Sequence, residues 1–301
     1  MAEIYQKYLD PRTLARLQGL DLRARHIVDG FVSGMHRSPY HGFSVEFAEH
    51  REYTPGDDLR YVDWKAFGRT DKFYIKRYED ETNLVCYLLL DTSESMKYRG
   101  PGMPMSKFEY AQCIAVLLAW LVLRQQDAVS LVTFDHAVRK LVPPSAGPSH
   151  MKQLIHAMEE TQAEHKTSTG PVFHQLAERF KKRGLIIVLS DLFDDLSPMI
   201  AGLKHFRHQR HEVAVFHVLD LAEIEFPFQR PTLFRGLEQL PEVLTEPRSL
   251  RKAYLEELNR FLGKVARECR NRQIEYSRIT TDQALDVALS TFLSKRAIRS
   301  A

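Results

Sequence analysis

The segment DTSES, residues 91–95, directly follows a continuous apolar run and places oxygen-bearing side chains at alternate positions. Asp91, Ser93 and Ser95 could supply carboxylate and hydroxyl oxygens to a hard divalent cation such as Mg²⁺, which prefers oxygen ligands. The alternative is a helix cap, because Asp and Ser after a strand often bond the first amides of the next helix. The choice between the two interpretations depends on the elements that position the segment.

Apolar runs of strand length alternate with helical patterns from Val85 onward. The run 85–90 is typical of a strand covered on both faces of a parallel sheet. Further strands are predicted at 129–134, 185–190, 213–219 and 274–278, and helices at 107–124, 149–160, 171–182, 196–209, 249–271 and 282–296. The short run 138–142 ends in two prolines, which predicts an antiparallel edge strand. The alternation predicts an α/β fold with a doubly wound, mostly parallel sheet and helices on both faces.

Two segments depart from this alternation. Residues 1–80 combine a basic helical pattern at 11–27 with a charged, aromatic and β-rich stretch at 40–80. This N-terminal segment is too short and too polar for a large core of its own, so we expect it to pack on the main domain, residues 81–301. Residues 222–247 interrupt the rhythm of the main domain and predict an inserted β-hairpin.

Other oxygen-bearing side chains fall at the same edge of the predicted sheet as Asp91. In open α/β sheets, ligands bind beyond the carboxyl ends of the strands. Asp191 follows the strand 185–190, and Thr167 lies in the loop before helix 171–182, with Thr169 as the alternative threonine. We therefore expect a site for Mg²⁺, or for Mn²⁺ or Ca²⁺, built from Asp91, Ser93, Ser95, Thr167 and Asp191.

The pattern Asp-x-Ser-x-Ser with a distant Thr and a distant Asp resembles the metal-ion-dependent adhesion site (MIDAS) of von Willebrand A-type domains. A second motif, EFAEHREYTPGDDLRYVDWKAFGRTDKFYIKRYEDE followed by LLLDTSESM, resembles the bacterial domain-of-unknown-function family 58 over roughly residues 20–220. The resemblance implies a von Willebrand A-like fold and a metal site. It also implies a MoxR-type AAA+ ATPase as a partner, because genes of this family often lie beside that ATPase. It implies no known reaction.

Composition excludes several classes of protein. The net charge of +3, from 42 basic and 39 acidic residues, is too balanced to indicate nucleic-acid binding. The three cysteines are too scattered for a disulfide framework or a thiolate metal site. The apolar helical stretch 114–123 is too short to cross a bilayer, and the N-terminus does not resemble a secretory signal. These features predict a cytoplasmic protein without membrane insertion.

Catalytic motifs are absent from the sequence. It contains no phosphate-binding Gly-x-x-x-x-Gly-Lys-Ser/Thr loop, no His-Glu-x-x-His and no Gly-x-Ser-x-Gly. An aspartyl-phosphate mechanism would place a second Asp two residues after Asp91, where the chain has Ser93. His205, His208 and His211 do not share one helical face, so we expect a solvated helix end there. The sequence therefore predicts no enzyme.

The sequence and the resemblance together predict a metal-dependent protein-binding adaptor. It would act with a MoxR-type AAA+ ATPase in the assembly or maturation of a client protein. One alternative is a metal-dependent phosphoester hydrolase that uses the Asp91 cluster. Another is a nucleic-acid-binding adaptor that uses the basic N-terminal segment. The mixed charges at 51–79 are expected to form ion pairs or a docking surface.

Overall fold

The structure is a computed structural model that describes residues 10–14, 20, 22–25, 27, 50–52, 74–76, 85–237, 242–289 and 292. The chain divides into two compact units, one of residues 1–37 with 84–301 and one of residues 38–83. In the second unit, the described residues form an antiparallel pair, β1 (His50–Glu52) with β2 (Tyr74–Lys76). The first 37 residues thus group with the α/β domain. Packing of residues 40–80 on that domain stays a prediction, because most of them lie outside the described residues.

The larger unit is built on a six-stranded sheet with the order β10-β7-β6-β3-β4-β5. The strands are β3 (Val85–Asp91), β4 (Ala128–Phe134), β5 (Val138–Ser145), β6 (Gly184–Ser190), β7 (Glu212–Leu219) and β10 (Glu275–Thr280). Every neighbouring pair is parallel except β4 and β5, which are antiparallel at one edge. The predicted α/β, von Willebrand A-like sheet is confirmed, including its antiparallel edge strand.

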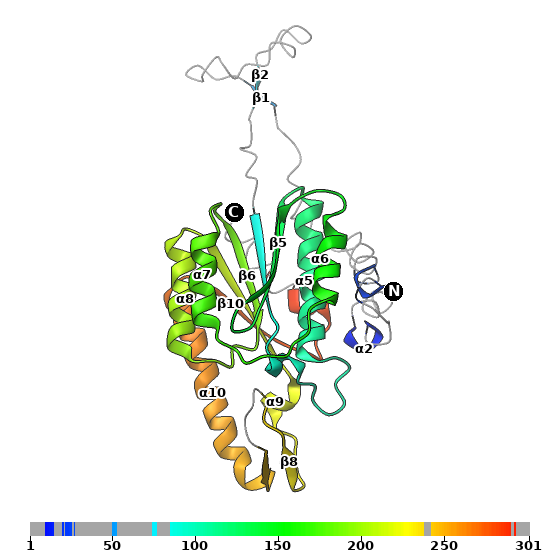
Figure 1. The fold of residues 1–301 in the computed structure, drawn as a ribbon, viewed down its shortest axis with the longest axis vertical. Helices are drawn as coiled ribbons and strands as arrows, with labels where there is room; N and C mark the ends of the chain where they lie inside the picture. The colour runs from blue at the N-terminus through cyan, green and yellow to red at the C-terminus, as the bar shows by residue number, and fades with distance from the viewer. Residues whose placement is uncertain are drawn as a thin grey trace. The chain divides into compact units, whose positions relative to one another are not determined.

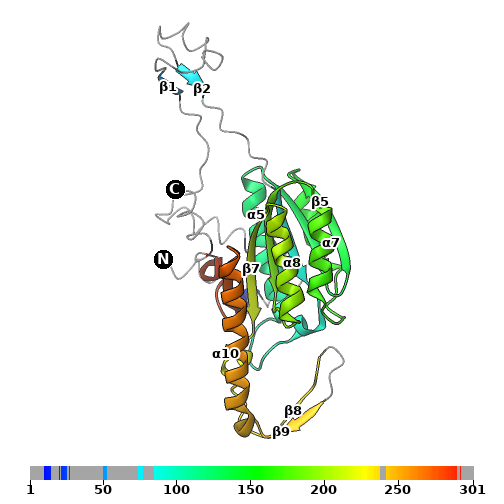
Figure 2. The ribbon, with the colours of Figure 1, turned by 90° about the vertical axis from the view of Figure 1, so that its left-hand side faces the viewer.

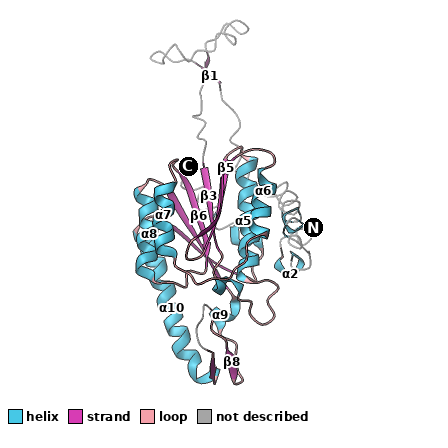
Figure 3. Ribbon diagram, viewed as in Figure 1, coloured by secondary structure: helices cyan, strands magenta, loops and turns pink. Residues whose placement is uncertain are grey.

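Helices cover both faces of this sheet, as Figures 1 and 3 show. The helices are α5 (Lys107–Arg124), α6 (His150–Glu159), α7 (Thr169–Arg179), α8 (Leu196–His208) and α10 (Pro247–Asn271). Alternate residues of β3 enter two different cores. Leu88 and Leu90 pack with α5 and α6, whereas Tyr87 and Leu89 pack with α7 and α8. Because both faces of β3 are buried, its sequence is a continuous apolar run.

Part of the N-terminal helical pattern packs on α5. Leu14 of the helix α2 (Pro11–Leu14), together with Leu20 and Ile27 among the described helical residues 20, 22–25 and 27, is buried in the same core as α5. Arg23 pairs with Glu109 of α5 at 3.2 Å. At the other end of the chain, the helix predicted at 282–296 is described at 282–289 and 292. Residues 285–289 and 292 are helical, whereas 282–284 form a turn, so the helix begins three residues later than predicted.

The segment predicted to hold an inserted hairpin begins with the short helix α9 (Leu221–Glu225), directly after β7. β8 (Thr232–Phe234) and β9 (Val243–Thr245) then pair as antiparallel strands. Figure 2 shows this pair beside the N-terminal half of α10, beyond the edge of the sheet. The segment therefore projects from the edge at which the parallel strands end.

His211 corrects one expectation from the sequence. The helix α8 ends at His208, and Arg210 turns the chain with a left-handed φ of 65°. His211 is consequently buried against the rings of Tyr87, Phe180 and Phe206 instead of lying on a solvated helix end. Burial lowers the pKa of His211 below its ordinary value. The helical-wheel prediction failed because it continued the helix three residues too far.

Candidate metal centre

The centre lies where the strand order reverses. β3 and β6 are neighbours, and the chain continues from β3 toward β4 on one side and from β6 toward β7 on the other. Such a switch point opens a crevice at the carboxyl ends of the strands, where ligands bind in open α/β sheets. Asp91 ends β3 and Ser190 ends β6. The Ser190 hydroxyl donates to Asp91 Oδ2 at 2.5 Å, which joins the two strand ends.

The DTSES loop turns its oxygens inward. The Ser93 amide donates to Asp91 Oδ1 at 2.9 Å, and Ser93 Oγ lies 3.0 Å from Ser95 Oγ. Asp91 and Ser93 are fully buried, and Ser95 is 9% exposed. Ser93 precedes the 3₁₀ helix η2 (Glu94–Lys97), but its side chain makes no capping hydrogen bond. The helix-cap alternative is therefore wrong for the Ser93 hydroxyl.

A second loop lies against the first. Ser93 forms a parallel bridge with His165, and the Glu94 amide donates to the His165 carbonyl at 2.8 Å. Thr167 follows two residues later in this loop and is buried, with 4% exposure. The alternative threonine, Thr169, donates through both its amide and its hydroxyl to Asp194 Oδ2, at 2.6 and 2.7 Å. Thr169 thus fixes the start of α7, and Thr167 is the threonine in the loop beside Ser93.

Asp191 is held by a buried cation. Lys107 Nζ, 1% exposed, donates to Asp191 Oδ2 and to Glu223 Oε1, each at 2.7 Å. The next residue, Leu192, is buried with a left-handed φ of 55°, a conformation that costs a non-glycine residue about 1–2 kcal/mol. Such local strain is common beside functional sites. The chain therefore bends sharply after Asp191, and that carboxylate already has an ion-pair partner.

Burial determines the protonation preferences at the centre. It raises the pKa of Asp91 to about 7, helped by the charge of Asp191. For Lys107, burial alone would lower the pKa, but the charges of Asp191 and Glu223 outweigh it and raise the pKa above its ordinary value. Burial also lowers the pKa of His217 to about 4. Asp191 thus has a cationic partner within the fold, whereas the contacts given above for Asp91 are hydrogen bonds from Ser93 and Ser190.

The residues fit a hard divalent cation. In octahedral Mg²⁺ coordination, with oxygens at about 2.1 Å, adjacent ligands lie about 3.0 Å apart. The two serine hydroxyls have this separation. Asp91 Oδ1 accepts from the Ser93 amide and Oδ2 from the Ser190 hydroxyl, and a carboxylate has about four lone-pair positions in all. In the part of the chain that the structure describes, no three His, Cys, Asp or Glu side chains gather as a metal-binding group. A metal centre here would consequently depend on hydroxyl ligands.

Three side chains of the candidate centre were not predicted from the sequence: Ser190, Lys107 and Glu223. A signal existed for Lys107, which opens the helix α5 directly after its cap Ser106. A cation in the first turn opposes the helix dipole and calls for a carboxylate partner. Ser190 and Glu223 gave no local signal, because their partners are distant in the sequence.

The family model described as "Protein of unknown function DUF58" matches residues 49–261, more than half of the chain. The chain belongs to the DUF58 family. The match begins and ends later than the resemblance drawn from the sequence, which spanned roughly residues 20–220. It includes all of the candidate centre and the segment from α9 to the first half of α10. DUF58 membership thus accounts for the two sequence motifs together and leaves the activity open.

Several proteins are similar to this DUF58 chain. The uncharacterized protein Mb1516 of Mycobacterium bovis and the uncharacterized protein Rv1480 of Mycobacterium tuberculosis are each 27% identical to it over 221 residues, which cover 72% of this chain and 68% of each relative. Among solved structures, the conserved hypothetical protein BatB of Bacteroides thetaiotaomicron aligns with 71% of this chain and 98% of its own, at 16% identity and a TM-score of 0.46.

An aerotolerance-related membrane protein of Bacteroides fragilis aligns with 72% of this chain and 99% of its own, at 17% identity and a TM-score of 0.46. Among the described residues of the present chain, no helix combines the length and apolar character needed to cross a membrane.

Proposed function

We propose that this protein is a metal-dependent protein-binding adaptor. The observation that carries the proposal is the buried set of Asp91, Ser93 and Ser95 at the switch point of the sheet. The two serine hydroxyls are 3.0 Å apart, and that of Ser93 makes no capping hydrogen bond. Thr167 lies in the adjoining loop. This set has the oxygen chemistry of a Mg²⁺ site, with Mn²⁺ or Ca²⁺ as other candidates.

The chemistry of the side chains favours a site that receives an outside oxygen. A bound divalent cation would supply an electrophilic centre for one carboxylate of a partner. Ser93, Ser95 and Thr167 are neutral, so they would not cancel the charge of that cation, and Asp91 would anchor it. Asp191 is paired with Lys107, which favours a role for Asp191 through water. The protein would bind a partner in this way without performing a reaction.

The partner assignment rests on family resemblance. We propose that a MoxR-type AAA+ ATPase supplies nucleotide energy while this chain recognises or presents a client protein for assembly or maturation. Location in the cytoplasm is part of the same proposal, and fractionation of the native cells would check it.

The test combines metal titration with partner capture. Calorimetric titration of the full chain with Mg²⁺ or Mn²⁺ should give one binding event, which Asp91→Ala and Ser93→Ala remove. Capture of the ATPase or client from the native lysate should weaken in chelator and recover with Mg²⁺. Ser197→Ala, on the exposed start of α8, is the matched control. Capture that is indifferent to both chelator and Asp91→Ala would overturn the metal-bridge mechanism.

One observation favours a hydrolase as the second candidate. Asp135, 1% exposed and directly after β4, lies 3.3 Å from His165 Nδ1, and the His165 backbone pairs with Ser93. A buried carboxylate that orients an imidazole is part of the arrangement of a general base, and the His165 backbone lies against the candidate metal centre. Phosphoester hydrolysis by the wild type that both Asp91→Ala and His165→Ala abolish would support this candidate over the adaptor.

A further inference from the structure

The projecting segment carries an unusual share of the exposed apolar surface. Six large hydrophobic side chains are exposed among the described residues. Four of them lie in the β8–β9 pair or in the first turn of α10. They are Leu233 at 47%, Val243 at 51%, Leu244 at 72% and Leu250 at 42% exposure. Leu233, Val243 and Leu244 belong to the β8–β9 pair, and Leu250 to the first turn of α10. Clustered exposed apolar side chains mark interaction surfaces.

The β8–β9 pair is held in place by contacts with α9 and α10. Phe226 packs against Phe234 and Tyr254, with ring centroids 5.7 and 4.6 Å apart. Arg251 of α10 donates to the carbonyls of Glu225 and Phe226 at 3.0 and 3.3 Å. The β8–β9 pair is thereby fixed to α9 and α10, so its apolar residues are presented on an ordered support.

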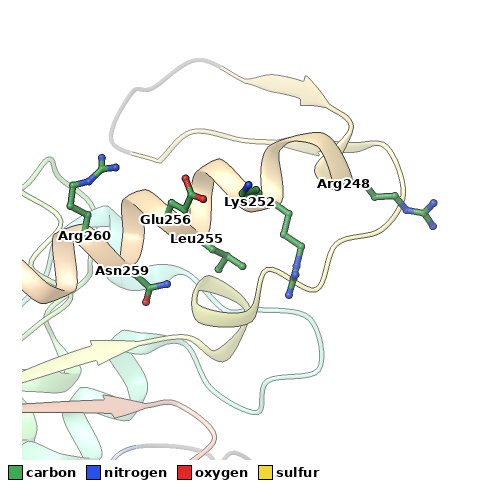
Figure 4. Close-up of a pocket in the computed structure, with 7 residues that line it drawn as sticks. Arg248, Lys252, Leu255, Glu256, Asn259 and Arg260 are labelled. Carbon is green, nitrogen blue, oxygen red and sulfur yellow. The ribbon is translucent and has the colours of Figure 1, made fainter.

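The neighbouring groove on α10 is basic. The groove is open, has a volume of about 670 Å³ and is lined by seven side chains of α10: Arg248, Arg251, Lys252, Leu255, Glu256, Asn259 and Arg260. Figure 4 labels all of them except Arg251. The groove thus contains four cationic side chains and one carboxylate. Arg260 pairs with Glu257. For Arg248 and Lys252, both exposed, the described residues provide no ion-pair partner. The groove therefore offers two cations without an ion-pair partner among the described residues, close to the apolar residues of the hairpin.

We propose that this surface, the α10–hairpin platform (Leu233, Val243, Leu244, Leu250, Arg248 and Lys252), binds an acidic amphipathic segment of a protein partner. Apolar side chains of that segment would cover the exposed leucines, and its carboxylates would pair with Arg248 and Lys252. Exposed Glu242, Glu246, Glu256 and Glu257 are interspersed on the same surface, and they would repel an anionic bilayer. A folded or folding peptide can place its own charges between these carboxylates, so a protein fits better than a membrane.

The platform is joined to the candidate metal centre through α9. Glu223 of α9 bonds Lys107, the partner of Asp191, and the carbonyl of Glu223 accepts from Tyr254 of α10 at 2.9 Å. One partner could therefore contact both sites. In this respect the inference rests on the proposed function, because it assigns the platform to the same partner that would place a carboxylate at the metal centre.

Two designed peptides test the platform without knowledge of the partner. One is an amphipathic 18-residue helix with Leu on one face and Glu on the other, and its matched counterpart has Lys in place of Glu. Fluorescence anisotropy with the full chain, in chelator, should show binding of the acidic peptide about tenfold or more tighter than the basic peptide, equivalent to about 1.4 kcal/mol. The double variants Arg248→Glu/Lys252→Glu and Val243→Ser/Leu244→Ser should each weaken binding of the acidic peptide by about tenfold or more.

The control double Lys181→Glu/Lys204→Glu makes the same charge change at exposed positions elsewhere and should leave binding within about twofold. Equal binding of the two peptides, or an equal loss in the control, would overturn the proposal. Binding to phosphatidylserine vesicles without binding of the acidic peptide would also overturn the proposal. Asp91→Ala should leave peptide binding in chelator unchanged while it removes metal titration, so failure of the platform and failure of the metal centre give different results.

Discussion

At the scale of single residues, the environment of Lys107 explains how Asp191 and Glu223 lie close together. Its ammonium group is buried and bonded to Asp191 and Glu223 at 2.7 Å. A buried ion pair contributes little in net terms, yet the loss of one member leaves an uncompensated charge. The main effect of removing Lys107 would thus be to leave Asp191 and Glu223 without their cation.

Replacement of Lys107 by Met is expected to destabilise the protein by about 3–5 kcal/mol, because Asp191 and Glu223 would stay buried without their cation. Urea denaturation of the full chain measures this loss. Lys97→Met, at an exposed position of η2, is the control and should change stability by no more than about 0.5 kcal/mol. A loss below about 1 kcal/mol for Lys107→Met would show that water or protonation compensates the two acids.

His211 predicts a dependence of stability on pH. Burial lowers its pKa below the ordinary value of 6.5, so below that pH the unfolded chain binds a proton that the native state resists. Stability should therefore fall as the pH drops from 7 toward 5, by up to about 1.4 kcal/mol per pH unit for this group. His211→Phe, in a pocket of aromatic rings, should flatten the slope, whereas exposed His208→Gln should not. Parallel slopes in the variant and the wild type would exclude His211 as the source.

Sequence reasoning predicted Asp91, Ser93 and Ser95 from one loop, and Thr167 and Asp191 from their places at the same edge of the expected sheet. Asp91, Ser93 and Ser95 could be read as a set because alternate positions of one loop share a direction. The first-turn position of Lys107 indicated a carboxylate partner without identifying it, and Ser190 gave no local signal, since their roles depend on the meeting of a helix start with two strand ends. Long-range pairs of this kind become visible only when the strand order is known.

At the scale of elements, close approach between helices decides the packing on one face of the sheet. A Cβ atom at Gly202 of α8 would lie 2.6 Å from Cβ of Phe173 of α7. Gly170 is similarly confined, with 2.6 Å to Cβ of Pro198. Both distances are too short for any larger residue without movement of a helix. Glycine is thus required at the contact of α7 and α8.

Two glycine substitutions should have opposite effects. Gly202→Ala is expected to destabilise by about 1–3 kcal/mol, because the added methyl group forces α7 and α8 apart. Gly263→Ala in α10, where no atom outside the helix's own nearby backbone lies within 4 Å of the added Cβ, should stabilise by about 0.5–1 kcal/mol through helix propensity. Thermal unfolding of the two variants makes the comparison. The same sign of change in both would contradict the packing argument.

Elements with a strong periodic pattern were predicted to within a few residues. β3 was expected at 85–90 and spans 85–91, and α5 matches the expected 107–124. The segment 222–247 was expected as a single hairpin, but it begins with the helix α9. Residues Asp220 and Glu223 form a capping box at its start, a signal that a short helix can give even without an apolar stripe.

At the scale of the whole molecule, the N-terminal helical residues belong to the core of the α/β domain. Ile27 is fully buried together with residues of α5, whereas Leu22 nearby is 51% exposed. The leucine and isoleucine positions of this region therefore divide into an inward and an outward face. The division gives a test of the N-terminal boundary of the domain.

Ile27→Ser should destabilise the α/β domain by about 3 kcal/mol, since it removes buried apolar volume and introduces a hydroxyl into the core. Leu22→Ser should have an effect below about 0.5 kcal/mol. Guanidinium denaturation followed by circular dichroism measures both. An unchanged midpoint for Ile27→Ser would place the N-terminal residues outside the cooperative unit.

The burial of every cysteine has a practical consequence. The chain contains three cysteines, and Cys86, Cys113 and Cys269 are all buried. Burial also raises the pKa of Cys113 and of Cys269 to about 12, so these two carry little thiolate near neutral pH. A thiol introduced by Leu244→Cys would then be the fast-reacting group toward maleimide dyes. A fluorophore or spin label could thus be attached at the tip of the hairpin without prior removal of the native cysteines.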